Sequence, residues 1–253
     1  MLAFHRYLGR VCIVATLVAT PGIAFSAPIT FFGEDLNNDP DVRIPHPNSD
    51  AARALFLSNL TGTGTETFES FAAGTGTPLP ISFPGAGTAT LTGSGVVLSQ
   101  PVGTNGTGRY PISGDQYWDT AAGGDFVINF SDPIAALGFY GVDVGDLGGQ
   151  LELVLTLSGG GTVNVIVPHT VGTDGSTDGS VLYFGFYDTT QTYTSVAFDN
   201  PSFEDFFAFD DMTIGSIEQV TPNPVVPEPT SMILLATGFA GAAARRLRKS
   251  RRS

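Results

Sequence analysis

The chain has 253 residues, a formal net charge of −13 at pH 7 and a single cysteine, Cys12. All 24 acidic residues lie within residues 27–229, which contain only three basic ones, so this body carries a formal charge of −21. Such a surface repels phosphate backbones and anionic lipid headgroups, which excludes a nucleic-acid-binding role. Because Cys12 precedes the body, disulfides and thiol chemistry are excluded from it as well.

Residues 1–26 have the features of a secretory signal peptide. Arg6 and Arg10 precede the apolar run 11–19, and small residues lie at positions 24 and 26, where a signal peptidase reads the chain. The apolar run is too short for a membrane anchor. We therefore expect export across the inner membrane, with signal peptidase as a partner and cleavage after residue 26 or 27.

A short helix is expected near the start of the β-sandwich, which is predicted to comprise residues 27–215 of this body. Asn48 or Ser49 can cap a helix whose alanines and leucines continue to about Ser58. We expect this helix to cover one open end of a β-sandwich.

The strongest strand signal is Gln150–Val167. Leucines alternate with other residues up to Leu157, three glycines follow, and valines then recur at every second position. This period of two around a glycine turn predicts an antiparallel hairpin. Similar runs lie at residues 65–71, 79–83, 88–98, 126–130, 135–140, 182–187, 192–198 and 206–214. About ten strands at roughly ten-residue spacing predict an all-β fold, an antiparallel two-sheet sandwich of jelly-roll type.

The segment from Arg109 to Trp118 is expected to form a loop that contains the sole tryptophan. Flat aromatic faces beside polar groups suit sugar rings, so Tyr110, Tyr117 and Trp118 are candidate carbohydrate contacts. The alternative is that this tryptophan packs in the core or at an edge.

Carboxylates gather at predicted turns, often next to glycine. Asp143 and Asp146 lie in YGVDVGDLGG, and Asp210 and Asp211 lie in FAFDDMTIG; Asp174 and Asp178 lie in TDGSTDG. Ca²⁺ takes six to eight oxygen ligands, so the first two pairs are candidate metal ligands. Asp210 and Asp211 rank first, because adjacent acids repel unless a cation intervenes or one side chain points into solvent. The alternative is ordinary turn chemistry, and no motif requires a cofactor.

Catalytic motifs are absent from the exported sequence. Only His46 and His169 remain, far apart, with no nucleophile elbow and no HExxH zinc helix. We expect no enzymatic activity; a carboxylate pair acting as a glycoside hydrolase is the remaining enzymatic alternative.

The end of the chain combines three features in one order. A proline-rich linker, residues 216–226, leads to Pro227-Glu228-Pro229, then to the uncharged segment 230–244 and a tail with six basic residues. As a helix the uncharged segment spans only about 22 Å, short of the roughly 30 Å hydrocarbon core.

Residues 227–253 resemble the PEP-CTERM sorting signal of Gram-negative bacteria that make exopolysaccharide. The resemblance implies that a membrane-embedded exosortase recognises Pro227, Glu228 and Pro229, cleaves near them and delivers the body to the cell surface, so that membrane contact is transient. The alternative is an ordinary C-terminal membrane anchor. The expectation is a non-enzymatic surface protein, a structural or adhesive component of an exopolysaccharide matrix. The alternative interpretation is a lectin-like carbohydrate-binding module.

Overall fold

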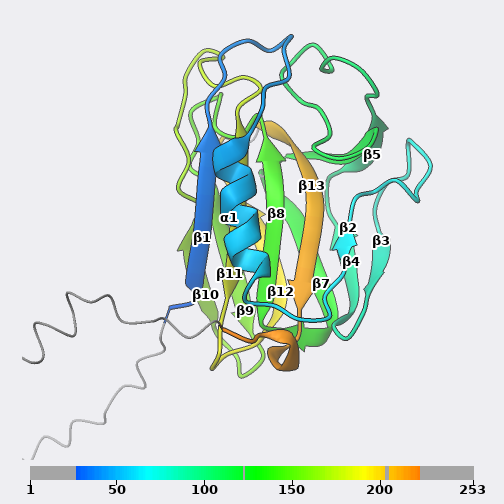
Figure 1. Ribbon diagram of the computed structural model, residues 1–253, viewed down its shortest axis with the longest axis vertical. Helices are drawn as coiled ribbons and strands as arrows, with labels where there is room; N and C mark the ends of the chain where they lie inside the picture. Colours follow the sequence, from blue (N-terminus) through cyan, green and yellow to red (C-terminus); the bar gives the residue numbers. More distant parts are fainter. Residues whose placement is uncertain (1–26, 122, 203–204, 223–253) are drawn as a thin grey trace, which may run out of the picture.

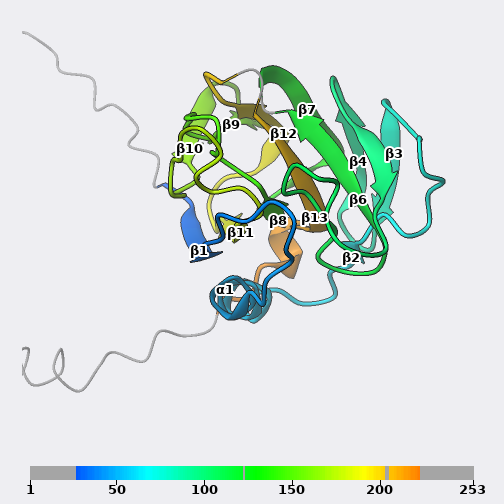
Figure 2. The same cartoon turned by 90° about the horizontal axis from the view of Figure 1, so that it is seen from above.

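A computed structural model describes residues 27–222 except residues 122, 203 and 204. Two antiparallel sheets pack face to face, and one helix lies on the outer face of the first sheet (Figure 1, Figure 2). The expected all-β, two-sheet sandwich of jelly-roll type with one helix is confirmed. The predicted signal peptide and the residues of the sorting signal lie outside the described residues.

The two sheets have non-sequential strand orders. In the first, the order is β1 (Ile29–Asp35), β11 (Val181–Tyr187), β8 (Ala136–Val142), β13 (Phe206–Gly215), β6 (Gln116–Ala121) and β5 (Val96–Ser99), with β2 (Thr65–Glu66) also on β13. In the second, the order is β10 (Thr162–Ile166), β9 (Glu152–Leu157), β12 (Tyr193–Asp199), β7 (Gly123–Ile134), β4 (Gly87–Thr92) and β3 (Leu79–Phe83).

The predicted hairpin is confirmed as β9 and β10. Leu153, Leu155 and Leu157 are buried between the sheets, whereas the residues between them are only partly buried. Val163 lies opposite Leu155, and the glycines after Leu157 make the turn. The alternation is clear because the other face of these strands is not covered by further structure.

Strands β8 and β11 are buried on both faces. Every residue of the two strands is buried, because one face meets the second sheet and the other lies under α1 (Pro47–Leu57). The helix was expected to cover an open end of the sandwich, and this prediction is wrong: α1 lies along the sheet face, against β1, β11 and β8 (Figure 1).

The cap of α1 also differs from the expectation. His46 is the N-cap residue, and neither Asn48 nor Ser49 caps the helix with its own side chain. Both instead donate backbone N–H groups to the carboxylate of Asp35 at the end of β1, at 3.2 and 2.9 Å. An anionic group at the positive end of the helix dipole thereby fixes α1 to the neighbouring strand.

A pair of glycines leaves space for the helix to pack against the sheet. Gly138 of β8 lies opposite Gly185 of β11, and the ring of Phe56 packs over both. A Cβ atom added at Gly138 would lie 2.2 Å from the Tyr183 hydroxyl and 2.7 Å from the Phe56 ring. The missing side chains therefore create the space that the Phe56 ring fills.

Two predicted runs differ from the structure, and two strands were missed. The run 88–98 is two strands, β4 and β5, which enter different sheets because Gly93 and Gly95 turn the chain with φ of +84° and +133°. Only Thr65–Glu66 of the run 65–71 is strand. Strands β1 and β6 were not predicted.

The expected linker begins later than residue 216. Residues Ile217–Gln219 form a 3-10 helix, and the Gln219 side-chain amide donates to the carbonyl groups of Gly62 and Pro84 at 2.7 and 2.9 Å. The Thr221 N–H donates to the Asn59 carbonyl at 2.8 Å. The folded body therefore extends to Thr221. Within the described part of the chain, no helix has the length and apolarity needed to cross a bilayer.

Removing the Phe56 ring should loosen the helix from the sheet. We expect Phe56→Ala to lower the free energy of unfolding by about 3–5 kcal/mol, because it leaves a cavity over the paired glycines. Urea denaturation measures the change. Leu55→Ala, on the solvent side of the same helix, is the control and should cost under about 0.5 kcal/mol; equal losses in the two variants would contradict this packing.

Candidate metal centre

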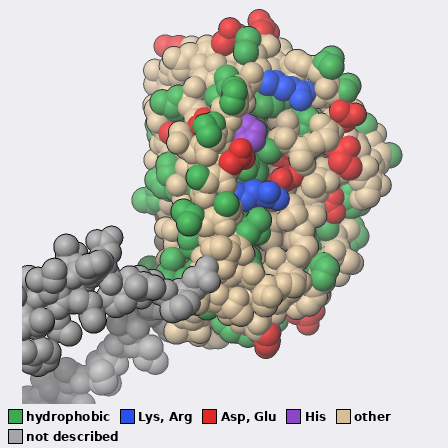
Figure 3. All heavy atoms as spheres, in the orientation of Figure 1, with side chains coloured by type: hydrophobic (Ala, Val, Ile, Leu, Met, Phe, Trp, Pro, Cys, Tyr) green, Lys and Arg blue, Asp and Glu red, His purple; other side chains and the backbone are tan. Residues whose placement is uncertain are grey.

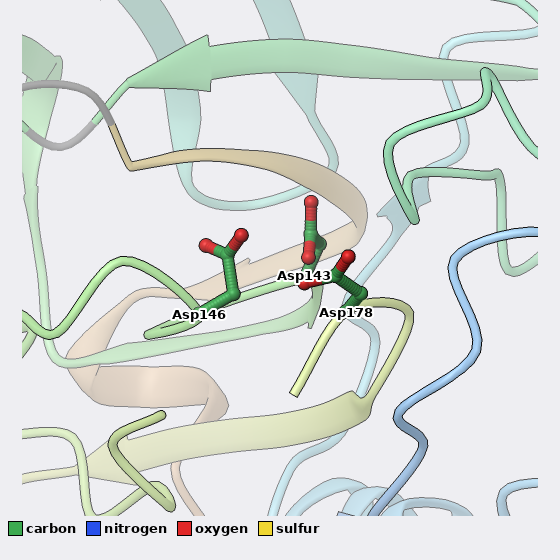
Figure 4. Close-up of side chains that lie close together, drawn as sticks. All are labelled: Asp143, Asp146 and Asp178. Atoms are coloured by element: carbon green, nitrogen blue, oxygen red, sulfur yellow. The ribbon is translucent and has the colours of Figure 1, made fainter. Parts of the chain in front are cut away.

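Three aspartates converge at the end of the sandwich where β8 ends (Figure 4). Asp143 directly follows β8, Asp146 lies in the loop between β8 and β9, and Asp178 lies in the loop before β11. One carboxylate oxygen from each lies within 4.8 Å of the others. Asp143 has a φ of +72°, a left-handed conformation that aspartate tolerates better than most residues, and this conformation turns the chain out of β8.

A fourth carboxylate, that of Asp205, lies against the same loop. The residue directly precedes β13 and is 1% exposed. Its Oδ2 accepts the Gly145 N–H at 3.1 Å and the Asn200 side-chain N–H at 2.7 Å. Its Oδ1 is buried and has no hydrogen-bond partner in the described chain. Gly145 lies between Asp143 and Asp146 in the chain, so its hydrogen bond holds Asp205 against the loop that contains both residues.

Positive charge near these carboxylates is scarce. Among the described residues only Arg109 forms an ion pair with the cluster, Nη1 to Asp143 Oδ2 at 3.4 Å, and it contacts Asp119 more closely, at 2.8 Å. Burial, together with the charges of Asp146 and Asp178, raises the pKa of Asp143 to about 9, although Arg109 partly opposes the shift. Burial likewise raises the pKa of Asp205 and of Asp178, and Asp146 adds to both shifts through a side-chain hydrogen bond and through its charge. Asp143, Asp178 and Asp205 therefore favour bound protons or a bound cation.

The cluster is open to solvent on one side. Asp146 and Asp178 line a hollow of about 370 Å³ together with Arg109, Leu147 and Phe206. An ion reaching this hollow would meet carboxylate oxygens that are already gathered. The sequence identified Asp143 and Asp146 as candidate ligands, and the structure adds Asp178 and Asp205. Asp178 lies in the glycine-containing turn TDGSTDG, whereas no pattern in the sequence pointed to Asp205.

Asp210 and Asp211 do not join this cluster. Both are buried in β13, at 0% and 5% exposure, so neither points into solvent, which was the alternative to metal binding. Asp210 Oδ2 accepts the N–H groups of Ile112 and Ser113 at 2.8 and 3.1 Å, and Asp211 pairs with Arg53 at 3.4 Å. A bulge with a φ of +50° at Asp211 breaks the alternation of β13 and lets both side chains bind protein groups.

The expected aromatic sugar platform is buried. Tyr110, Tyr117 and Trp118 are 2%, 0% and 0% exposed, so none presents a ring face to solvent. The cause is β6, which lies between β13 and β5 with both faces covered: Trp118 points into the core between the sheets and stacks on Phe68, with ring centroids 6.2 Å apart, while Tyr117 faces the opposite side. Core packing, the alternative considered from the sequence, is the arrangement found.

The two histidines lie in separate local contacts. His46 Nδ1 lies 2.9 Å from Asp50 at the start of α1. His169 is buried, and its Nε2 accepts the Leu151 N–H at 3.0 Å. Burial lowers the pKa of His169, although the Thr170 carbonyl and Glu34 partly oppose the shift. This acceptor role requires the neutral imidazole.

Residues 225–249 match the family model of the PEP-CTERM protein-sorting motif, which confirms the C-terminal sorting signal. The motif indicates export and exosortase processing at the cell surface. No curated protein matches the chain.

Solved structures similar to the chain are distant. The CBM22-1 xylan-binding domain of Paenibacillus barcinonensis Xyn10C aligns with 16% identity and a TM-score of 0.33, over 61% of this chain and 100% of that one. The K2 cleaved adhesin domain of Lys-gingipain aligns with 14% identity and a TM-score of 0.28, over 60% and 98%. TmCBM61, in complex with β-1,4-galactotriose, aligns with 14% identity and a TM-score of 0.26, over 51% and 88%. Likenesses of this size carry no argument about the ligand of this chain.

Loss of the Asp210 carboxylate should destabilise the fold. Asp210→Ala leaves the buried N–H groups of Ile112 and Ser113 without an acceptor, so we expect the free energy of unfolding to fall by at least about 2 kcal/mol. Chemical denaturation measures this loss. Asp125→Ala, at an exposed position of β7, is the control; an Asp210 variant as stable as this control would contradict the assigned role.

His169 should make stability depend on pH. Because its folded pKa is lowered from 6.5, its contribution is fully present above pH 6.5 and is lost as the pH falls through the lower folded value. His169→Asn should therefore cost more stability at about pH 8 than at about pH 5. Urea unfolding of both proteins at the two pH values gives the difference, and an equal cost at both would refute the buried neutral imidazole.

Proposed function

We propose that this protein is a non-enzymatic structural or adhesive component of an extracellular polysaccharide matrix, delivered to the cell surface by export and exosortase processing. The observation that carries the proposal is the sorting motif at residues 225–249. In this proposal Pro227, Glu228 and Pro229 are the recognition residues, and signal peptidase removes residues 1–26.

The boundary of the folded body supports processing at the triplet. The last described backbone hydrogen bond, from Thr221 to Asn59, ends before Pro227. Cleavage near Pro227 therefore removes none of the described contacts that hold the sandwich together. A body that stays folded after its tail is lost is what this sorting route requires.

The charge of the body supports a role outside the membrane. Acidic side chains are spread over the face drawn in Figure 3, with few basic ones among them. After both ends are removed the charge of about −21 is no longer offset by the basic tail. Repulsion from anionic headgroups then favours the hydrated space beyond the cell surface.

Intact-mass analysis of the protein from its native host tests this function. We expect material in the matrix fraction that lacks both residues 1–26 and the basic tail, and little in the membrane fraction. Glu228→Ala should shift the protein to the membrane fraction with its tail attached. Glu218→Ala, an exposed acid outside the triplet, is the control and should be processed normally. Native protein that keeps its arginine-rich end in the bilayer would show a tail-anchored domain instead.

A further inference from the structure

We propose that Asp143, Asp146, Asp178 and Asp205 bind one calcium ion, which joins three loops at one end of the sandwich. The inference is independent of the proposed function, because it concerns the folded body alone. Four carboxylates supply hard oxygen ligands of the kind that Ca²⁺ prefers.

The spacing of the cluster suits calcium. Oxygens of Asp143, Asp146 and Asp178 lie within 4.8 Å of one another (Figure 4). Two ligands on opposite sides of Ca²⁺ are separated by about twice its bond length of roughly 2.4 Å, so the oxygens already fall within one coordination shell. Mg²⁺ requires a smaller octahedral shell at about 2.1 Å, which a group drawn from separate loops matches less well.

Asp205 is an independent indication of a cation site, because its side-chain neighbour in the cluster is Asp146, another acid. Its Oδ1 is buried without a partner in the described chain, although its Oδ2 is fixed by Gly145 and Asn200. These two contacts prevent the carboxylate from turning to solvent. Asp178 Oδ1 is likewise buried and unpartnered among the described residues. A buried carboxylate oxygen without a donor is costly, and a cation bound by both residues removes that cost.

Arg109 does not balance the negative charge of the four carboxylates. Arg109 contacts one of the four carboxylates and is closer to Asp119, which lies outside the cluster. A divalent ion next to Asp146 and Asp178 balances the carboxylates that Arg109 does not reach. The open hollow beside them admits the ion and leaves space for the waters that complete its shell.

Calcium titration of the full chain, stripped with a chelator and held in mild detergent, tests the site. Isothermal titration should show about one Ca²⁺ per chain, and the melting temperature should rise by at least about 5 °C when calcium exceeds its Kd a hundredfold. Mg²⁺ should have a clearly smaller effect. Asp146→Asn and Asp178→Asn should each weaken calcium binding at least tenfold.

Melting in chelator separates loss of the site from damage to the fold. Without calcium, both variants should melt at or above the wild-type temperature, because each removes a repelling charge. Asp174→Asn, an exposed aspartate in the loop that carries Asp178, is the matched control and should bind calcium as the wild type does. A wild-type melting curve unchanged by millimolar calcium, an equal effect of Mg²⁺, or a calcium response that persists in Asp146→Asn and Asp178→Asn would overturn the proposal.

Discussion

The packing of phenylalanine rings between the two sheets is the interaction on which this structure depends. Phe139 of β8 and Phe209 of β13 face Phe126 of β7 and Phe198 of β12, and the ring centroids of facing residues lie 5.3 to 5.6 Å apart. Burial of each ring stabilises the fold by about 1.5–3 kcal/mol, and the body has no disulfide that would add to this stability. The two sheets, and with them every loop at their ends, are positioned by this layer.

Strand β13 runs from one end of the sandwich to the other. Its first residues pair with the end of β8, beside the acidic cluster, and its last residues pair with the start of β8. The chain leaves toward the sorting signal from that second end, after the 3-10 helix (Figure 1). The acidic loops therefore lie at the opposite end of the body from the segment that leads to the tail. The two features can act without obstructing each other.

Buried acids divide into two kinds in this fold. Asp35 and Asp210 accept hydrogen bonds from backbone N–H groups, so each holds one element to another. Burial and the neighbouring Asp211 nevertheless raise the pKa of Asp210 well above its usual value. Asp205 and Asp178 each have a buried oxygen without a donor in the described chain. The first kind joins elements of the fold, whereas the second kind is the basis of the proposed calcium site.

The sequence by itself determined the sorting signal, the all-β class and the β9–β10 hairpin. Each of these features depends on local sequence. The sorting signal is recognised from the order of motif, apolar segment and basic tail, and the strands from the alternation of residues where one face of the sheet is uncovered. Alternation failed for β6, where neighbouring Tyr117 and Trp118 are both buried, and for β13, where a bulge turns both Asp210 and Asp211 inward.

Only the tertiary structure decided which carboxylates meet and where the helix lies. Asp143, Asp178 and Asp205 come from loops that are distant in the chain and are joined by the pairing of β11, β8 and β13. The helix lies on a sheet face because two glycines, on strands far apart in sequence, are placed opposite each other. Local sequence reports the period and charge of one segment, whereas these contacts depend on which strands pair and in which register.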